Sequence, residues 1–147
     1  MALVYLDNCT LQRPLDDRIQ FRVRVEAEAV EAIIREAELG RIQLLNSDVL
    51  ISESGAAPDP TRRDFAAGTL QLAVRTIPLD EVIEDRARPY KAAGIKSLDA
   101  LHLASAVEAG ADFFCTTDDP FFRKASVANT AGVRVVTPPD LAVALGL

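Results

Sequence analysis

Several residue types are scarce in this chain of 147 residues. It has no tryptophan, one histidine and two cysteines, and aromatic residues make up only 5%. The histidine and cysteines, His102, Cys9 and Cys115, lack the paired local spacing that zinc sites show, which argues against a zinc site. So few aromatic rings also argue against an extended platform on which bases could stack.

The chain also lacks a long hydrophobic run and an export signal. Its apolar runs are too short to cross a bilayer, and the opening stretch MALVYLDN has no basic residues before it and no small-residue cleavage site after it. We therefore expect a cytoplasmic protein with reduced thiols at Cys9 and Cys115, and we expect no membrane partner.

Positive net charge is absent as well. The chain carries 16 lysine and arginine residues against 22 aspartate and glutamate residues, a formal net charge of −6. This balance argues against a protein that is held on nucleic acid by its overall charge. It leaves a nuclease open, because carboxylates that bind cations are counted here as bare negative charges.

Apolar strand-like stretches alternate with amphipathic ones along the whole chain. Hydrophobic residues make up 49% and charged residues 26%, which is typical of a globular protein, and we expect one domain over residues 1–147. Nearly continuous apolar strands indicate a parallel sheet covered by helices on both faces, a three-layer α/β/α sandwich. The predicted strands are ALVYLD, IQLL, AVRTIPL, ADFFCTT and VRVVTP. The predicted helices are 17–39, 49–54, 61–73, one that starts at Glu81 and is kinked or broken at Pro89, 97–110, a short turn after Asp118, and 138–145.

Four acidic residues occupy positions where a ligand site is expected. Asp7 directly follows the first strand and Asp118 the fourth, while Asp99 lies in the first turn of the helix that leads into the fourth strand. Glu53 lies within the helix after the second strand. Ligands of parallel α/β sheets gather beyond the carboxyl ends of the strands. If the fourth strand lies beside the first, Asp7 and Asp118 are neighbours.

Each acid also has a structural explanation when it is taken alone. Asp7 and Asp118 can be turn or cap residues, Asp99 can favour the start of its helix, and Glu53 can be an exposed helical residue. The functional hypothesis therefore depends on the set. Converging carboxylates repel one another, and divalent cations such as Mg²⁺ relieve that repulsion. Two such ions about 4 Å apart can promote phosphodiester cleavage, which makes the acids metal ligands.

The motifs YLDNCTLQRP, NSDVLISES, GIKSLDALHLASA and FFCTTDDPF resemble those of the PIN-domain ribonucleases along nearly the whole chain. The resemblance implies a twisted, parallel five-stranded sheet and metal-dependent internal cleavage of RNA with Mg²⁺ or Mn²⁺. It places Asp7, Glu53, Asp99 and Asp118 in the metal site, with the Thr116 hydroxyl helping to shape it. Further polar residues that the resemblance places around the site are Asn8, Ser47 and Asp119.

The resemblance also implies partner proteins, and the sequence differs from the family pattern in two places. Small members of the family similar to the VapC type are often toxins of toxin–antitoxin pairs, so it implies a small antitoxin that blocks the metal site, and a homodimer. Cys9 stands where the family often has serine or asparagine, and its thiol is a weaker hydrogen-bonding group. Glu53 lies in SESGAA, a stretch of small residues that indicates a short helix.

The remaining polar candidates are the cations and the histidine. Lys96, three residues before Asp99, is a candidate for contact with RNA, as are Arg13 and Arg123, although ordinary surface charge explains each one alone. His102 shares a helix face with Asp99, but a single histidine among leucine and alanine is more often a packed core residue.

Three other functions have partial support in the sequence. A haloacid-dehalogenase-like phosphatase begins with a strand followed by D-x-D-x-T, but Cys9 replaces the second aspartate here. A phosphoacceptor receiver domain needs a lysine after the fifth strand, where the chain has VVTPP. A catalytically degenerate PIN-like module that binds proteins is the non-enzymatic alternative, and the retained acids argue against it.

Overall fold

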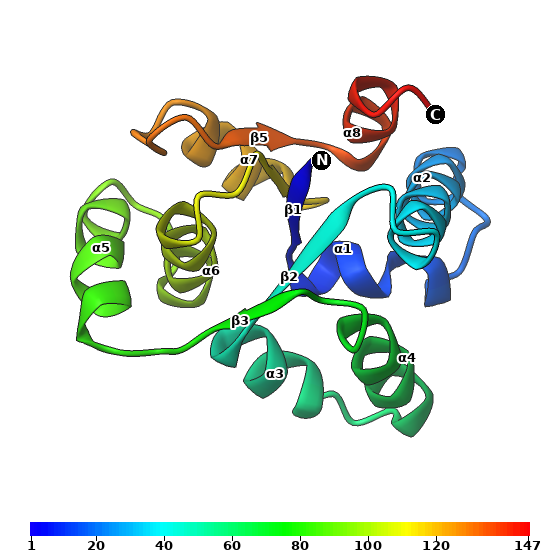
Figure 1. Cartoon of the computed structure of the whole chain (residues 1–147), viewed down its shortest axis with the longest axis horizontal. Coiled ribbons are helices and arrows are strands. Elements are labelled where there is room, and N and C mark those ends of the chain that lie inside the picture. The colour runs from blue at the N-terminus through cyan, green and yellow to red at the C-terminus, as the bar shows by residue number, and fades with distance from the viewer.

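Five short parallel strands form the centre of the molecule, in the order β3-β2-β1-β4-β5 (Figure 1). The computed structural model describes residues 1–147. The strand order reverses between β1 and β4, as in doubly wound folds. The predicted α/β architecture is confirmed. The strands are β1 (Leu3–Leu6), β2 (Gln43–Ser47), β3 (Arg75–Ile77), β4 (Phe113–Cys115) and β5 (Arg134–Val136).

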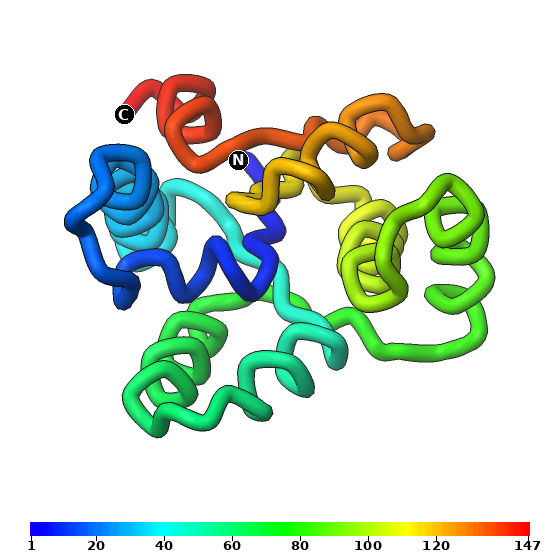
Figure 2. The backbone as a smooth tube through the Cα atoms, turned by 180° about the vertical axis from the view of Figure 1, so that it is seen from behind, coloured from blue at the N-terminus to red at the C-terminus, as the bar shows by residue number.

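Helices cover both faces of this sheet. Helices α2 and α8 lie on one face, and α6 lies on the other with α5 outside it, as the views from front and back both show (Figures 1 and 2). Helices α3 and α4 follow β2 on the side of β3. The helices are α1 (Asn8–Gln12), η1 (Arg13–Leu15, a 3₁₀ turn), α2 (Phe21–Glu38), α3 (Asp48–Gly55), α4 (Pro60–Leu70), α5 (Glu81–Ala92), α6 (Ser97–Glu108), α7 (Asp119–Ser126) and α8 (Pro138–Ala144).

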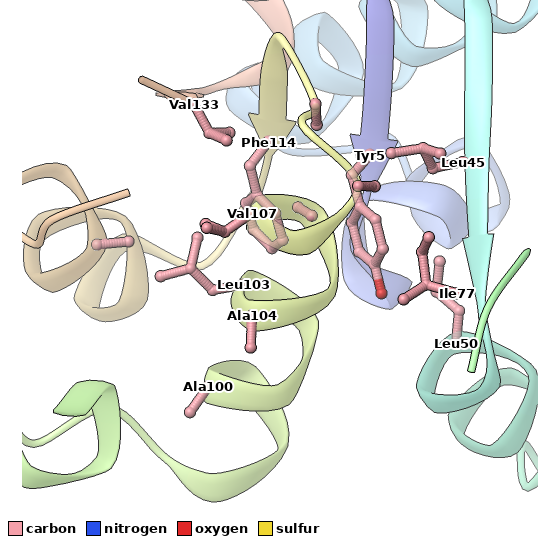
Figure 3. Packing of buried hydrophobic residues seen from close by; sticks show 14 of the residues in the cluster. Tyr5, Leu45, Leu50, Ile77, Ala100, Leu103, Ala104, Val107, Phe114 and Val133 are labelled. Carbon is pink, nitrogen blue, oxygen red and sulfur yellow. The ribbon is translucent and has the colours of Figure 1, made fainter. Parts of the chain in front are cut away.

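The strands bury side chains on both faces, which explains their continuous apolar sequences. Val4 and Leu6 point into the smaller cluster beneath α2 and α8, whereas Tyr5 points into the larger cluster beneath α6. The Tyr5 ring stacks on Phe114 of β4 with 5.2 Å between centroids, and Figure 3 shows it between α6 and the side chains from β2 and β3. The central strand is thereby fixed from both sides.

The observed elements differ from the predicted ones in two places. Helix α1 and turn η1 occupy the link after β1, so α2 begins at Phe21 and not at Asp17. Helix α5 also continues past Pro89 to Ala92. Because Pro89 lies in the last turn, its missing N–H costs the helix one hydrogen bond near the end. None of the helices has the length and apolar character needed to span a membrane.

The packing of α8 gives a test of the fold. Leu141 is fully buried beneath α8, whereas Val143 on the same helix is 77% exposed. Leu141→Ala should lower the free energy of unfolding by about 2–5 kcal/mol because it opens a cavity in the core. Val143→Ala should change it by less than about 0.5 kcal/mol. Urea denaturation followed by circular dichroism measures both, and equal effects would contradict the described packing of α8.

Candidate active site

The site lies where β1 and β4 end side by side. Leu6 pairs with Cys115 in parallel register, so Asp7 and Asp118 both follow the carboxyl ends of neighbouring strands, as the sequence predicts. Thr116 directly follows β4, two residues before Asp118. Its hydroxyl oxygen accepts a hydrogen bond of 3.1 Å from the Asp118 backbone N–H. This bond fixes the turn that leads from β4 to Asp118.

Asp7 and Asp118 both cap the helices that follow them. Asp7 Oδ1 accepts a 3.1 Å hydrogen bond from the Thr10 N–H at the start of α1. Asp118 Oδ1 accepts one of 3.0 Å from the Phe121 N–H at the start of α7. Each of these residues can therefore be both a helix cap and a site acid, because the capping hydrogen bond orients its carboxylate at the edge of the sheet where the strands end.

The Asp7 carboxylate is the most deeply buried of the four acids, with 3% of the residue exposed. Burial raises its pKa, and hydrogen bonds from Thr116, Thr10 and Cys9 partly offset that rise. The Cys9 thiol lies 3.1 Å from Asp7 Oδ1 and accepts a 3.1 Å bond from the Thr117 hydroxyl. Burial of the sulfur beside this carboxylate raises the pKa of the thiol to about 12, so Cys9 stays protonated as a donor to Asp7.

Asp99 joins these acids from the first turn of α6. Burial, together with the negative charges of Asp7, Asp118 and Glu53, raises its pKa to about 6, while His102 acts in the opposite direction. Asp99 therefore lies close enough to all three other acids for their charges to raise its pKa. The four carboxylates that the sequence singled out lie in one electrostatic cluster.

Glu53 reaches this cluster through a buried chain of hydrogen bonds, here called the Tyr5–His102 chain. Glu53 Oε1 lies 2.8 Å from His102 Nε2, and His102 Nδ1 lies 2.6 Å from the Tyr5 hydroxyl. The Tyr5 hydroxyl lies 2.7 Å from Ser47 Oγ, which accepts a 3.0 Å bond from the Leu50 N–H. Tyr5 and Ser47 are fully buried and His102 is 1% exposed.

The Tyr5–His102 chain has one proton arrangement in which every atom is satisfied with neutral tyrosine and histidine. Ser47 donates to Tyr5, Tyr5 donates to His102 Nδ1, and His102 Nε2–H donates to Glu53. Burial raises the pKa of Tyr5, so its hydroxyl keeps the proton it donates. The prediction that His102 is a packed structural residue agrees with this geometry, but His102 also determines where the Glu53 carboxylate lies.

The donor set of this cluster fits a hard divalent cation. No three histidine, cysteine, aspartate or glutamate side chains lie close enough together to enclose an ion directly. Mg²⁺, however, keeps several waters and needs only one or two carboxylates. Burial raises the pKa of both Asp7 and Asp99, and neighbouring negative charges raise that of Asp99 as well, so a bound cation would stabilise the ionised form of each. Asp7, Asp99 and Asp118 are the residues that would hold it.

Other predicted residues have different partners in the structure. Both oxygens of Asp119 are bound by Arg22 at 2.6 and 2.7 Å, which lowers its pKa and turns it away from a shared role with Asp118. Arg13 forms ion pairs with Asp16 and Glu26, so it is not a free cation for RNA. Asn8 accepts a hydrogen bond from Gln12 within α1. Lys96 and Arg123 are exposed and form no ion pair.

Sequence reasoning missed Tyr5, which connects Ser47 to His102. The one available signal is its place two residues before Asp7 in an otherwise aliphatic strand, because a buried tyrosine needs a partner for its hydroxyl.

Removing the Tyr5 hydroxyl tests the Tyr5–His102 chain. Tyr5→Phe should lower the free energy of unfolding by about 1–3 kcal/mol, because the buried His102 nitrogen loses its partner. Tyr90→Phe is the matched control: its hydroxyl donates to the Asn129 carbonyl near the surface, where water can replace it, so a loss below about 1 kcal/mol is expected. Denaturant titration of both variants measures the difference, and a smaller loss for Tyr5→Phe would refute this role.

Titration of Asp99 within the acid cluster should make the free energy of unfolding of the metal-free protein depend on pH. The folded pKa of about 6 lies above the usual aspartate value of 3.8, so the ionised side chain destabilises the fold, and the cost is fully developed once the pH has risen through about 6. With chelator present, Asp99→Asn should therefore be about 1–2 kcal/mol more stable than the original chain at pH 7.5, after allowance for partial exposure, and equal to it at pH 4.

Asp140→Asn is the control for that measurement. Asp140 also lies in the first turn of a helix, α8, but outside the cluster. Its substitution should give no gain at pH 7.5, because a helix start favours negative charge. Thermal melts at both pH values compare the variants, and a gain shared by both would mean that the acid cluster is not its source.

Comparisons with known proteins identify the family to which the chain belongs. A model of the PIN domain family matches residues 17–127, which include Glu53, Asp99 and Asp118. Ribonuclease VapC46 of Mycobacterium tuberculosis is 28% identical over 145 residues, covering 94% of this chain and 99% of that protein.

Two solved structures share the fold at low sequence identity. PAE2754 from Pyrobaculum aerophilum has a TM-score of 0.59 at 16% identity, covering 99% of this chain and 97% of the other. VapBC2 from Rickettsia felis, bound to a DNA fragment from their promoter, has a TM-score of 0.58 at 10% identity, covering 92% and 98%. Because the family model spans well over half of the chain and the fold agrees, this protein belongs to the PIN domain family.

Proposed function

We propose that this protein is a metal-dependent endoribonuclease. The observation that carries the proposal is that four carboxylates lie near the point where the strand order reverses. The negative charges of Asp7, Asp118 and Glu53 all raise the pKa of Asp99 there. Family membership and the similarity to a ribonuclease support the same activity. The proposed nuclease domain is the whole chain, residues 1–147.

The roles of the residues follow from their surroundings. Asp7, Asp99 and Asp118 would hold Mg²⁺ or Mn²⁺, and the bound ion would supply a water of lowered pKa and offset charge on the phosphodiester. Cys9 and Thr116 keep the Asp7 carboxylate oriented through the contacts described above. His102 holds Glu53 at the edge of the cluster, from where its carboxylate can accept hydrogen bonds from water on the ion.

We further propose that the protein acts as the toxin of a toxin–antitoxin pair. The structural similarity to VapBC2 supports this role together with the small size of the chain. Such a role predicts a small protein partner that covers the acidic cluster, and it is consistent with the predicted homodimer.

Cleavage of RNA is the direct test of the activity. The purified chain should cut RNA internally with Mg²⁺ or Mn²⁺ and not with chelator, as seen from fragment lengths on a denaturing gel. Asp7→Asn and Asp99→Asn should each reduce the rate by about 100-fold or more, since each removes charge that holds the ion. Asp85→Asn should leave the rate unchanged, because Asp85 is exposed on α5 and pairs with Arg88.

Binding of the ion alone separates the nuclease from a degenerate protein-binding module. Calorimetric titration with Mn²⁺ should show binding to the original chain and to Asp85→Asn, and strongly weakened binding to Asp99→Asn. Absence of Mn²⁺ binding by the original chain, or full RNA cleavage by folded Asp7→Asn, would overturn the assignment.

A further inference from the structure

A small cavity beside the acid cluster contains two of the three lysines of the chain. It encloses about 60 Å³ and is lined by Lys96 and Lys124 together with Asp99, Asp118 and three apolar residues. A single buried water needs about 10–15 Å³, so the cavity has room for a group the size of a tetrahedral oxyanion. Neither its size nor its charge suits a base.

The two ammonium groups are not neutralised by ion pairs. No carboxylate lies within ion-pair distance of Lys96 or Lys124 anywhere in the structure. Lys124 Nζ donates a 2.8 Å hydrogen bond to the Gly94 carbonyl, which ties α7 to the loop before α6 and holds this ammonium in place. Lys96 Nζ has no hydrogen bond to the protein.

The opposite side of the acid cluster has a different charge arrangement. Arg13, Arg22 and Arg62 lie there on η1, α2 and α4, and each is already bound to one or two carboxylates. A phosphate approaching from that side would have to displace these carboxylates. On the lysine side the cationic groups are available.

The charge of the cavity depends on whether the acids hold a cation. Its two lysines and two aspartates balance when they are alone. A divalent ion held by Asp99 and Asp118 leaves the cavity with a net positive charge, which attracts an anion. Lysine is a strong point-charge ligand of phosphate. Resting on the proposed function, we propose that Lys96 and Lys124 bind the phosphate of an RNA nucleotide adjacent to the cleaved bond, so that the strand enters on the side of α7.

Binding of RNA under conditions in which it is not cut tests this subsite. The original chain is used with Ca²⁺, a hard cation that also takes oxygen ligands, with the integrity of the RNA checked on a gel. Its affinity for a labelled single-stranded RNA is measured by fluorescence anisotropy at several salt concentrations. Each lysine that contacts phosphate should contribute about 0.7 to the slope of log K against log salt. Lys96→Gln and Lys124→Gln together should reduce that slope by about 1.4 and weaken binding by about 10-fold.

Lys91→Gln is the matched control, because Lys91 is exposed on α5 outside the cavity and its loss changes the net charge by the same amount. It should change the slope by less than about 0.2. Lys96→Gln alone should account for about half of the double effect, and it breaks no hydrogen bond of the fold. Thermal melts verify that each variant folds.

The outcomes are distinguishable. Equal losses for Lys91→Gln and the cavity variants would overturn the subsite, because overall charge would then explain the binding. An unchanged slope in the double variant would overturn it as well. If the original chain binds no RNA at all, the ribonuclease proposal fails, and the subsite fails with it.

Discussion

The hydrogen-bond chain from Ser47 through Tyr5 and His102 to Glu53 is the interaction on which the site depends. It joins β1, the end of β2, α3 and α6, elements that are separated by up to 97 residues along the chain. Every group in its interior is buried, where an unpartnered hydroxyl or imidazole costs about 1–3 kcal/mol. The elements that carry Asp7, Glu53 and Asp99 therefore have one satisfactory arrangement relative to one another.

Asp7 and Asp118 also have a structural role as helix caps. Asp7 and Asp118 each use one carboxylate oxygen to start a helix, and those bonds direct the side chains toward the strand ends. A cap supplies only part of the stabilisation that a buried carboxylate needs, so the pKa of Asp7 remains raised. The acid cluster is held by the fold at a cost in free energy, and binding of a divalent cation would lower that cost.

The positions of the acids were predictable from sequence, and their partners were not. Asp7 and Asp118 follow apolar strands, and parallel strands bring their carboxyl ends to one edge, so local pattern and topology suffice. Nothing in the local pattern of Tyr5 indicates a bond to a histidine 97 residues away. The pairing of Arg22 with Asp119 spans the same separation and depends on how α2 is placed after an unforeseen helix and turn.

Charge is distributed unevenly around the acids, and this asymmetry follows from the packing. The arginines near α2 are long side chains that connect η1, α2, α4 and the start of α7, so their charge is used for structure. Lys96 directly precedes α6 and Lys124 lies in the last turn of α7, and neither forms an ion pair. A chain with a net charge of −6 can thus present a local cationic path to an anionic substrate, because Asp16, Glu26 and Asp119 are paired with arginine, and Asp99 and Asp118 lie where a cation would bind.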